Sequence, residues 1–517
     1  MRLKIDPLKC VRCGLCEVAC SLNRDSVLTP MTSSIMLHVD DKANYFGLVL
    51  KSGGSSLVLA RPEGTSTGQQ AGGSGGPGAK PILLREACDF CEGSPRCALI
   101  CPTLCISVVD CLYLRNGKIG IFDLGSKEIG EEELAEGTTW EKMSSISIAD
   151  DLASEHGEDS LILGTGVLTG SFVPASCAGI VRGRNDADGR PRLMPIMGFA
   201  GFELKLSGFD FIVIKGVAER PGYLWIRDGM IDIVNAEELR PLDSWARTDK
   251  VRADQGDPKI QVIAGGAWCD SKHPKSQAVI DYWGGDDKSG IGGELGKKNL
   301  VAIAFRGMGE LALAEPEGHF EDAILLMREH VVKLGENHGL ASYSDVADRG
   351  DFKKLLHRNV GCYGCPFPCR SYLKIAEDPA EMRLVAKEPG YLHYDIPALR
   401  EAFRVGFDAK DATVALMKCA KAGAEAHTVL KWASEISSKV TMGSVDEVLV
   451  NPADAKRSRV EHPPGNFETS FDSADTYRAC LGLGLCPRYW AKAGFDMLQI
   501  GSFAQDTLGR TVPIEDS

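Results

Sequence analysis

The sequence has no apolar run long enough to cross a bilayer, and it has no excess of basic residues. A membrane-spanning helix needs about twenty consecutive apolar residues. The opening residues 1–6 do not begin a secretory signal. Lysine and arginine total 58 against 71 acidic residues, and the resulting net charge of −13 disfavours nucleic acid or an anionic membrane surface as partner. We therefore expect a cytoplasmic protein without a membrane segment.

Cysteine, in contrast, is abundant. The 517 residues are enough for three or four domains with apolar cores, and they include 18 cysteines, most of which lie in three tight groups. Disulfides are rare in a reducing compartment, and cysteines at short, regular spacing are typical of metal ligands. The sequence therefore indicates a metal-binding protein.

Two of these groups lie in residues 1–111, which we interpret as a two-cluster ferredoxin-like domain. The first run has C-x2-C-x2-C-x3-C spacing and the second C-x2-C-x5-C-x3-C-P spacing. In such modules the last cysteine of each run ligates the other run's cluster. The spacing predicts one [4Fe-4S] cluster on Cys10, Cys13, Cys16 and Cys101, and a second on Cys88, Cys91, Cys97 and Cys20. Two zinc sites are the alternative. The longer gap in the second run resembles the small iron–sulfur subunits of larger oxidoreductases.

The two runs are separated by a segment rich in glycine and serine, at about residues 51–80. Such a composition buries little apolar area, so we predict a mobile insertion, with a functional lid as the less favoured alternative. Cys105 and Cys111 follow the second run and are interpreted as bystanders. No role is assigned to Cys177, Cys269, Cys419 and Cys480.

The third group is Cys362, Cys365 and Cys369, on a backbone interrupted by glycine and proline. Three thiols at C-x2-C-x3-C spacing can converge on one soft metal centre, and Cys486 is the best candidate for the fourth ligand. We predict a third [4Fe-4S] cluster. A zinc knuckle closed by Cys480 or Cys486, or a redox dithiol, remains open.

The periodicity predicts an α+β multidomain fold. Short apolar runs between glycine turns indicate a β-rich domain over residues 112–308, with strands at 117–124, 160–163, 209–214, 222–226, 260–263 and 299–305. Residues 309–517 have helical periodicity, clearest at 320–334 and 411–436. The third cysteine group thus belongs to a helical domain.

Several motifs in the same order resemble those of the aldehyde ferredoxin oxidoreductase family of tungsten-pterin enzymes. They are Gly-Thr-Gly-Val-Leu-Thr-Gly at 164–170, Gly-Phe-Glu-Leu-Lys-Leu-Ser-Gly-Phe-Asp at 201–210, Gly-Lys-Lys-Asn-Leu-Val-Ala-Ile at 296–303, the third cysteine group, and Gly-Leu-Cys at 484–486. The resemblance extends from about residue 115 to 505. It implies the family's body with a ferredoxin fused in front, shortened and divergent at its C-terminal end.

The resemblance also implies cofactors. Members of the family hold two pterin dithiolenes on one tungsten beside a [4Fe-4S] cluster, and Cys362, Cys365, Cys369 and Cys486 fall on the cluster positions. The segments 197–201 and 290–293 fall where backbone amides approach a pterin phosphate, which glycine permits. The implied cofactor-binding residues are Gly198, Gly201, Gly292, Gly293 and, in place of a family arginine, Lys288.

Departures from the family pattern lie at the catalytic chemistry. The leading aspartates of its two pterin motifs are replaced by Ala420 and Leu481, and a glutamate corresponds to Leu392. The segment with the active-site histidine is missing between about residues 450 and 475. Aldehyde oxidation needs a positioned proton acceptor, and neither Glu388 nor His393 is an obvious substitute. We therefore assign no catalytic residue and doubt that a tungsten bis-pterin is bound.

The sequence thus predicts an iron–sulfur electron-transfer subunit of an oxidoreductase complex. Its expected partners are an intact family relative and a ferredoxin-like or flavin-bearing protein, in an oligomer. The alternative is an active tungsten or molybdenum oxidoreductase that oxidises an aldehyde or related carbonyl compound and passes electrons to its fused ferredoxin. A scaffold role in a redox complex is a third hypothesis.

Overall fold

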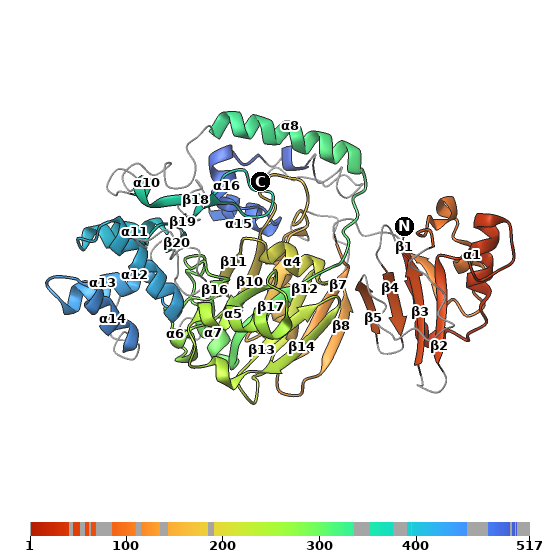
Figure 1. Ribbon diagram of the computed structural model, residues 1–517, viewed down its shortest axis with the longest axis horizontal. Coiled ribbons are helices and arrows are strands. Elements are labelled where there is room, and N and C mark those ends of the chain that lie inside the picture. The colour runs from red at the N-terminus through yellow and green to blue at the C-terminus, as the bar shows by residue number, and fades with distance from the viewer. Residues whose placement is uncertain are drawn as a thin grey trace. The chain divides into compact units, whose positions relative to one another are not determined.

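The computed structural model divides into two compact units. The first consists mainly of residues 1–112 and the second mainly of residues 113–517. The structure describes residues 2–40, 45–51, 57–61, 64–68, 85–109, 115–134, 143–184, 191–334, 352–375, 390–393, 395–451, 474–496, 499–501 and 503. Each unit is considered by itself (Figure 1).

The first unit combines paired strands with short helices around its cysteines. Strand β1 (Arg2–Ile5) pairs antiparallel with β6 (Ile106–Val109), so the two ends of the unit lie side by side. Helix α1 (Leu15–Asp25) carries Cys16 and Cys20 of the first run, and helix α2 (Arg96–Leu99) carries Cys97 of the second run. The core of this unit includes buried thiols as well as aliphatic side chains, namely Cys16, Cys20, Cys97, Cys105, Ile35, Leu48, Leu50, Ala60 and Ile106.

A four-stranded antiparallel sheet lies between the two cysteine runs, in the order β2 (Ile35–Asp40), β3 (Tyr45–Lys51), β4 (Leu57–Arg61) and β5 (Gly64–Gly68). Strands β4 and β5 lie within the segment at about 51–80 where the sequence predicted a mobile insertion. The physical reason is the apolar run at the start of β4, where Leu57 and Ala60 are buried against the neighbouring strand. The glycine-rich residues 69–80 lie outside the described part of the chain.

The second unit contains a six-stranded mixed sheet. Its order is β11 (Pro191–Ile196), β10 (Gly179–Arg184), β9 (Leu161–Thr165), β12 (Phe211–Lys215), β7 (Lys118–Asp123) and β8 (Ile129–Glu133). The pair β12–β7 is parallel, and the other pairs are antiparallel. Every residue of β9 is buried, as expected for a central strand covered on both faces, here partly by α3 (Ser145–His156).

A five-stranded sheet accompanies it, in the order β14 (Met230–Asn235), β13 (Gly222–Arg227), β17 (Leu300–Arg306), β15 (Gln261–Ala264) and β16 (Val279–Ile280). The helices among these strands are α4 (Ala200–Leu206), α5 (Ser244–Gln255), α6 (Ala267–Asp270) and α7 (Ile291–Lys297). All six strands predicted between residues 117 and 305 are present in these two sheets, within two residues at either end.

The C-terminal part is mostly helical. Helices α11 (Ile396–Arg404), α12 (Ala409–Ala422), α13 (Ala426–Ile436) and α14 (Met442–Val450) pack together, and α8 (Pro316–Leu334) packs on α16 (Pro487–Ala493), which follows α15 (Ala474–Gly482) (Figure 1). The sequence did not predict the three-stranded sheet β18 (Leu356–Val360), β19 (Arg370–Leu373) and β20 (Gly390–His393), which follows α10 (Phe352–Leu355). No helix within the described residues has the length and apolarity to cross a membrane.

Candidate functional site

The third cysteine group is brought together in the second unit. Cys362, Cys365 and Cys369 lie on the loop between β18 and β19, and Cys486 lies immediately before α16. Burial, and then the nearby thiols of Cys486, Cys362 and Cys369, raise the pKa of Cys365. The four predicted ligands therefore face one another, although Cys486 is distant in sequence.

Residues 173–178, between β9 and β10, join the two parts of this ligand set. The Ala175 N–H donates to Gly364 O (2.8 Å), and Ala175 O accepts from the Cys486 N–H (2.9 Å). Ala175 adopts a left-handed conformation (φ 58°), which is uncommon outside glycine and often marks functional sites. Ala175 is thus hydrogen-bonded both to the C-x2-C-x3-C loop and to Cys486, the predicted fourth ligand.

A fifth thiol, which the sequence left unassigned, belongs to this group. Cys177 is fully buried, with the thiols of Cys362 and Cys486 as its neighbours. The neighbouring Cys177 thiol, assisted by the charge of Arg370, lowers the pKa of Cys362 to about 6. A lone cysteine far from any other in sequence gives no spacing signal, so sequence reasoning could not find it.

Two buried arginines surround the third group. Arg488 Nη1 donates to Cys369 Sγ (3.7 Å), and Arg370 Nη2 donates to Asp286 Oδ2 (3.2 Å). Arg488 also lies 3.9 Å from Asp286. Within the described residues, Arg370 Nε is buried with no hydrogen-bond acceptor. Positive charge favours thiolates, the form that binds metals, so these surroundings fit an iron–sulfur cluster held by the four cysteines.

The other two groups lie in the first unit. Cys10, Cys13, Cys16 and Cys101 line one cavity. Cys20 lies instead beside Cys88 and Cys97, and Cys91 is also near both. Each run thus has its last cysteine with the other run, the arrangement that bacterial-type ferredoxin spacing produces. Both sets of four thiols fit a cluster.

Cys105, interpreted from the sequence as a bystander, also lines the cavity of the first group. It is buried next to Cys10, and burial together with the Cys10 thiol raises its pKa to about 12. Cys105 therefore remains a protonated neighbour of the predicted ligands. Cys111 lies outside the described residues.

The glycines that the resemblance implied as phosphate-binding pack against the chain itself. A Cβ at Gly201 would lie 2.5 Å from Cys177 O, and one at Gly292 would lie 2.6 Å from the Gln277 carbonyl carbon. Gly293 closely approaches His273 O in the same way, and at Gly198, where φ is 79°, a Cβ would lie 2.8 Å from Arg370 Nη1. Internal packing thus accounts for glycine at each of these positions.

The backbone amides at the start of α7 already donate hydrogen bonds to an anionic side chain of the protein itself. The buried carboxylate of Asp287 accepts from the backbone N–H groups of five residues at 2.8–3.1 Å: Ala278, Ser289, Gly290, Ile291 and Gly292. Backbone donors arranged in this way at a helix N-terminus ordinarily attract a phosphate or carboxylate. Here the chain supplies that carboxylate itself.

Lys288 is likewise engaged within the chain. Its ammonium pairs with Asp395 and, at 2.8 Å, with Glu425 Oε1. Burial alone would lower the pKa of Lys288, but the charges of the two carboxylates outweigh burial and raise it. The lysine is therefore a charged member of a buried triad that carries one positive and two negative charges.

A comparison with protein families assigns much of the second unit. Residues 114–307 match the family described as "Aldehyde ferredoxin oxidoreductase, N-terminal domain". Residues 114–307 are therefore assigned to the aldehyde ferredoxin oxidoreductase family. The resemblance on which the sequence analysis relied is thereby confirmed.

Among curated proteins, the chain is 27% identical over 249 residues to the tungsten-containing aldehyde ferredoxin oxidoreductase of Pyrococcus abyssi, a match that covers 41% of this chain and 40% of the relative. It is 25% identical over 337 residues to the "aliphatic sulfonate oxidoreductase, WOR-like subunit" of Pyrococcus furiosus, covering 51% of this chain and 50% of the relative. The matches thus span half or less of each relative's length.

A solved structure shares the fold. The active-site complex BamBC of benzoyl coenzyme A reductase, in complex with 1,5-dienoyl-CoA, aligns with a TM-score of 0.54 over 77% of this chain and 62% of that chain. At 15% identity this similarity concerns the fold alone.

The structure describes only some of the positions at which the aldehyde ferredoxin oxidoreductase family has catalytic groups. Leu392 and His393 lie in β20, where the structure describes only the backbone. Glu388 and most of the segment between 450 and 475 lie outside the described residues. The assignment of no catalytic residue stays a prediction.

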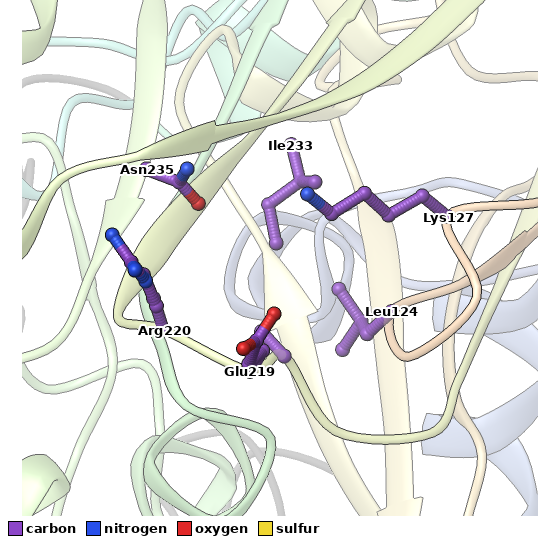
Figure 2. A pocket seen from close by; sticks show the side chains of 7 residues that line it. Leu124, Lys127, Glu219, Arg220, Ile233 and Asn235 are labelled. Atoms are coloured by element: carbon purple, nitrogen blue, oxygen red, sulfur yellow. The ribbon is translucent and has the colours of Figure 1, made fainter.

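One pocket of the family domain is separate from the thiols. A cavity of about 190 Å³ is lined by Leu124, Lys127, Ala218, Glu219, Arg220, Ile233 and Asn235. Figure 2 shows Lys127, Glu219 and Arg220 around this space, so charges of both signs face it. None of these lining residues is a thiol, and the pocket offers no ligand for an iron–sulfur cluster.

Proposed function

We propose that this chain is an iron–sulfur electron-transfer subunit of an oxidoreductase complex, with three [4Fe-4S] clusters and without tungstopterin catalysis of its own. The observation that carries the proposal is a contrast within the described residues. The thiols gather in three sets of four, whereas the groups that the family resemblance assigned to a pterin are bound to other parts of the chain.

The electrostatics around α7 support the absence of a pterin phosphate. Because the carboxylate of Asp287 already accepts five amide hydrogen bonds, a phosphate there would have to displace a buried anion or lie against it. Lys288 offers no compensating charge, since two carboxylates surround it. The residues present do not fit a tungsten bis-pterin, and we derive no reaction step through one.

The first unit supports a role in electron relay. Two cross-ligated clusters in one small unit are typical of ferredoxins, whose clusters each carry one electron. Cys13, a predicted ligand of the first cluster, is solvent-exposed, so this cluster would be accessible to a redox partner. The proposed partners are an intact family relative and a ferredoxin-like or flavin-bearing protein, and the name of the WOR-like relative, a subunit, supports an assembly of this kind.

Metal analysis of the purified full chain tests this proposal. We expect about twelve iron atoms and as many sulfides per chain, from three four-iron clusters. Tungsten and molybdenum should be far below one atom per chain. About one tungsten or molybdenum atom per chain, retained through purification, would contradict the proposal.

An active tungsten or molybdenum oxidoreductase is the second candidate, favoured by the tungsten-containing relatives. In that case the substrate would be an aldehyde or related carbonyl compound, and the first unit would accept the electrons. Purified chain that contains tungsten and reduces viologen dye with an aldehyde would establish this function. Metal-replete chain that never does so would exclude it.

A further inference from the structure

Cys177 is a thiol for which the cluster chemistry has no ligand position. A [4Fe-4S] cluster takes one cysteine at each of four irons, and Cys362, Cys365, Cys369 and Cys486 fill these positions. Cys177 is nevertheless buried next to two of these four, Cys362 and Cys486.

The location of Cys177 is fixed by the backbone on both sides of it. Ala175 is bonded to Gly364 and Cys486 through its N–H and carbonyl groups, and the Ala178 N–H donates to Gly484 O (2.9 Å). Gly201 packs so closely on the Cys177 carbonyl that no larger residue fits. The thiol is therefore held beside the ligand set by contacts that do not involve its sulfur.

We propose that Cys177 is a positioning residue of the third cluster, whose S–H group donates a hydrogen bond to a ligating sulfur and raises the cluster's reduction potential. The proposal rests on the proposed function, since it requires a cluster at this site.

The direction of the effect follows from charge. Reduction adds one electron to the cluster, and the added negative charge is shared with the ligating sulfurs. A hydrogen bond to such a sulfur is stronger in the reduced state, so it stabilises that state and raises the potential. Because Cys177 is fully buried, water cannot replace its S–H group as donor without rearrangement of the loop.

The experiment compares Cys177→Ala and Cys177→Ser in the full chain, with potentials measured by redox titration followed by electron paramagnetic resonance. The signal of the third cluster is identified by its loss in Cys365→Ala. We expect both Cys177 variants to keep the wild-type iron content. The alanine variant should have a lower third-cluster potential, and the serine variant, which keeps a hydroxyl donor, a potential at or above that of the wild type.

Cys269→Ala is the matched control. It removes another fully buried thiol, one that donates to Gln277 O (3.2 Å), and should leave the third-cluster potential unchanged. An unchanged potential in Cys177→Ala, or an equal fall in both Cys177 variants, would overturn the proposal. So would loss of about four iron atoms in Cys177→Ala, because Cys177 would then be a ligand.

Two further outcomes are separable. If the alanine variant does not fold, a serine variant with a third-cluster potential below the wild type overturns the proposal, and one at or above it supports it. If the wild type itself holds only about eight iron atoms and lacks the signal that Cys365→Ala abolishes, the third cluster is absent. That result overturns both this inference and the count of three clusters. The wild-type iron content and spectrum are therefore measured before any Cys177 variant is examined.

Discussion

At the scale of single residues, the third cysteine group is distinguished by the charges around it. Arg488 contacts the sulfur of Cys369 directly, and Arg370 lies close enough to the group to favour the thiolate of Cys362. Asp286 bridges the two guanidinium groups. Arg370 directly follows Cys369, and Arg488 is the second residue after Cys486, so the segments that supply these ligands also supply the charge.

Replacing Arg488 with methionine should lower the reduction potential of the third cluster. Loss of about 1.4 kcal/mol of differential stabilisation, within the range of a charged hydrogen bond, corresponds to about 60 mV for one electron. Redox titration of the variant measures the shift. Arg478→Gln, which changes an exposed arginine 3.4 Å from Asp150, is the control and should shift nothing. Equal potentials in wild type and Arg488→Met would show that the charge is screened.

Lys205 gives a prediction about pH. It is fully buried, with its Nζ donating to Gly166 O (2.6 Å), and burial lowers its pKa to about 7. Between this value and the usual lysine range near 10.5, the unfolded chain binds a proton that the folded chain lacks, so raising the pH favours the folded state. The contribution should grow by up to about 2 kcal/mol between pH 7 and pH 9.

Denaturant unfolding of wild type and Lys205→Met at these two pH values measures this contribution. The difference in unfolding free energy between them should increase with pH in favour of the wild type. A difference that shrinks as the pH rises would mean that the buried lysine keeps its proton when folded.

At the scale of secondary-structure elements, helix α7 depends on Asp287. Asp287→Ala would leave the amides of Ala278 and of residues 289–292, three of them buried, without this acceptor, at a cost of about 1–3 kcal/mol or more. Asp287→Asn keeps one acceptor oxygen and should cost less. Denaturant titration of both variants tests this order. If they were equally stable, the carboxylate would not be the group that satisfies these amides.

The strands and helices with strong periodicity were predictable from sequence. Residues 209–214 are rich in aromatic and β-branched side chains, and β12 begins within them. Residues 411–436 have helical periodicity throughout but form two helices, because Gly423 (φ 68°) ends α12 and packs against the backbone at Gly266. Strands β18–β20 carry charged residues and follow no simple alternation, so only tertiary pairing could identify them.

The site was predictable to a similar degree. Regular spacing and a family motif identified the twelve cysteines that gather in three groups. Cys177, Arg370 and Asp287 carry no such pattern, and their roles depend on which distant segments fold beside them. Lys288 was predicted to bind a cofactor, but its two carboxylate partners, Asp395 and Glu425, are distant in sequence and could not be inferred from spacing.

At the scale of the whole molecule, the two units should depend differently on metal. The core of the first unit includes thiols among few apolar side chains, whereas the second unit has extensive apolar cores of its own. Metal binding in such small thiol-lined cores is coupled to folding. Removal of iron with a chelator should therefore make residues 1–112 sensitive to protease while most of the second unit stays resistant.

Limited proteolysis with mass mapping, before and after iron removal, makes this comparison. Reconstitution with iron and sulfide should restore the resistance of the first unit. Equal sensitivity of both units after chelation would contradict the prediction, because it would show that the second unit also needs its cluster to remain folded.

The link through Ala175 between the C-x2-C-x3-C loop and Cys486 bears on the order in which the protein can mature. All eight cysteines predicted to ligate the first two clusters have left the ribosome early in synthesis, so those clusters can be inserted while translation continues. Insertion of the predicted third cluster must wait for Cys486, which is synthesised long after Cys362, Cys365 and Cys369. A chain interrupted before that point would carry two clusters and an open third site.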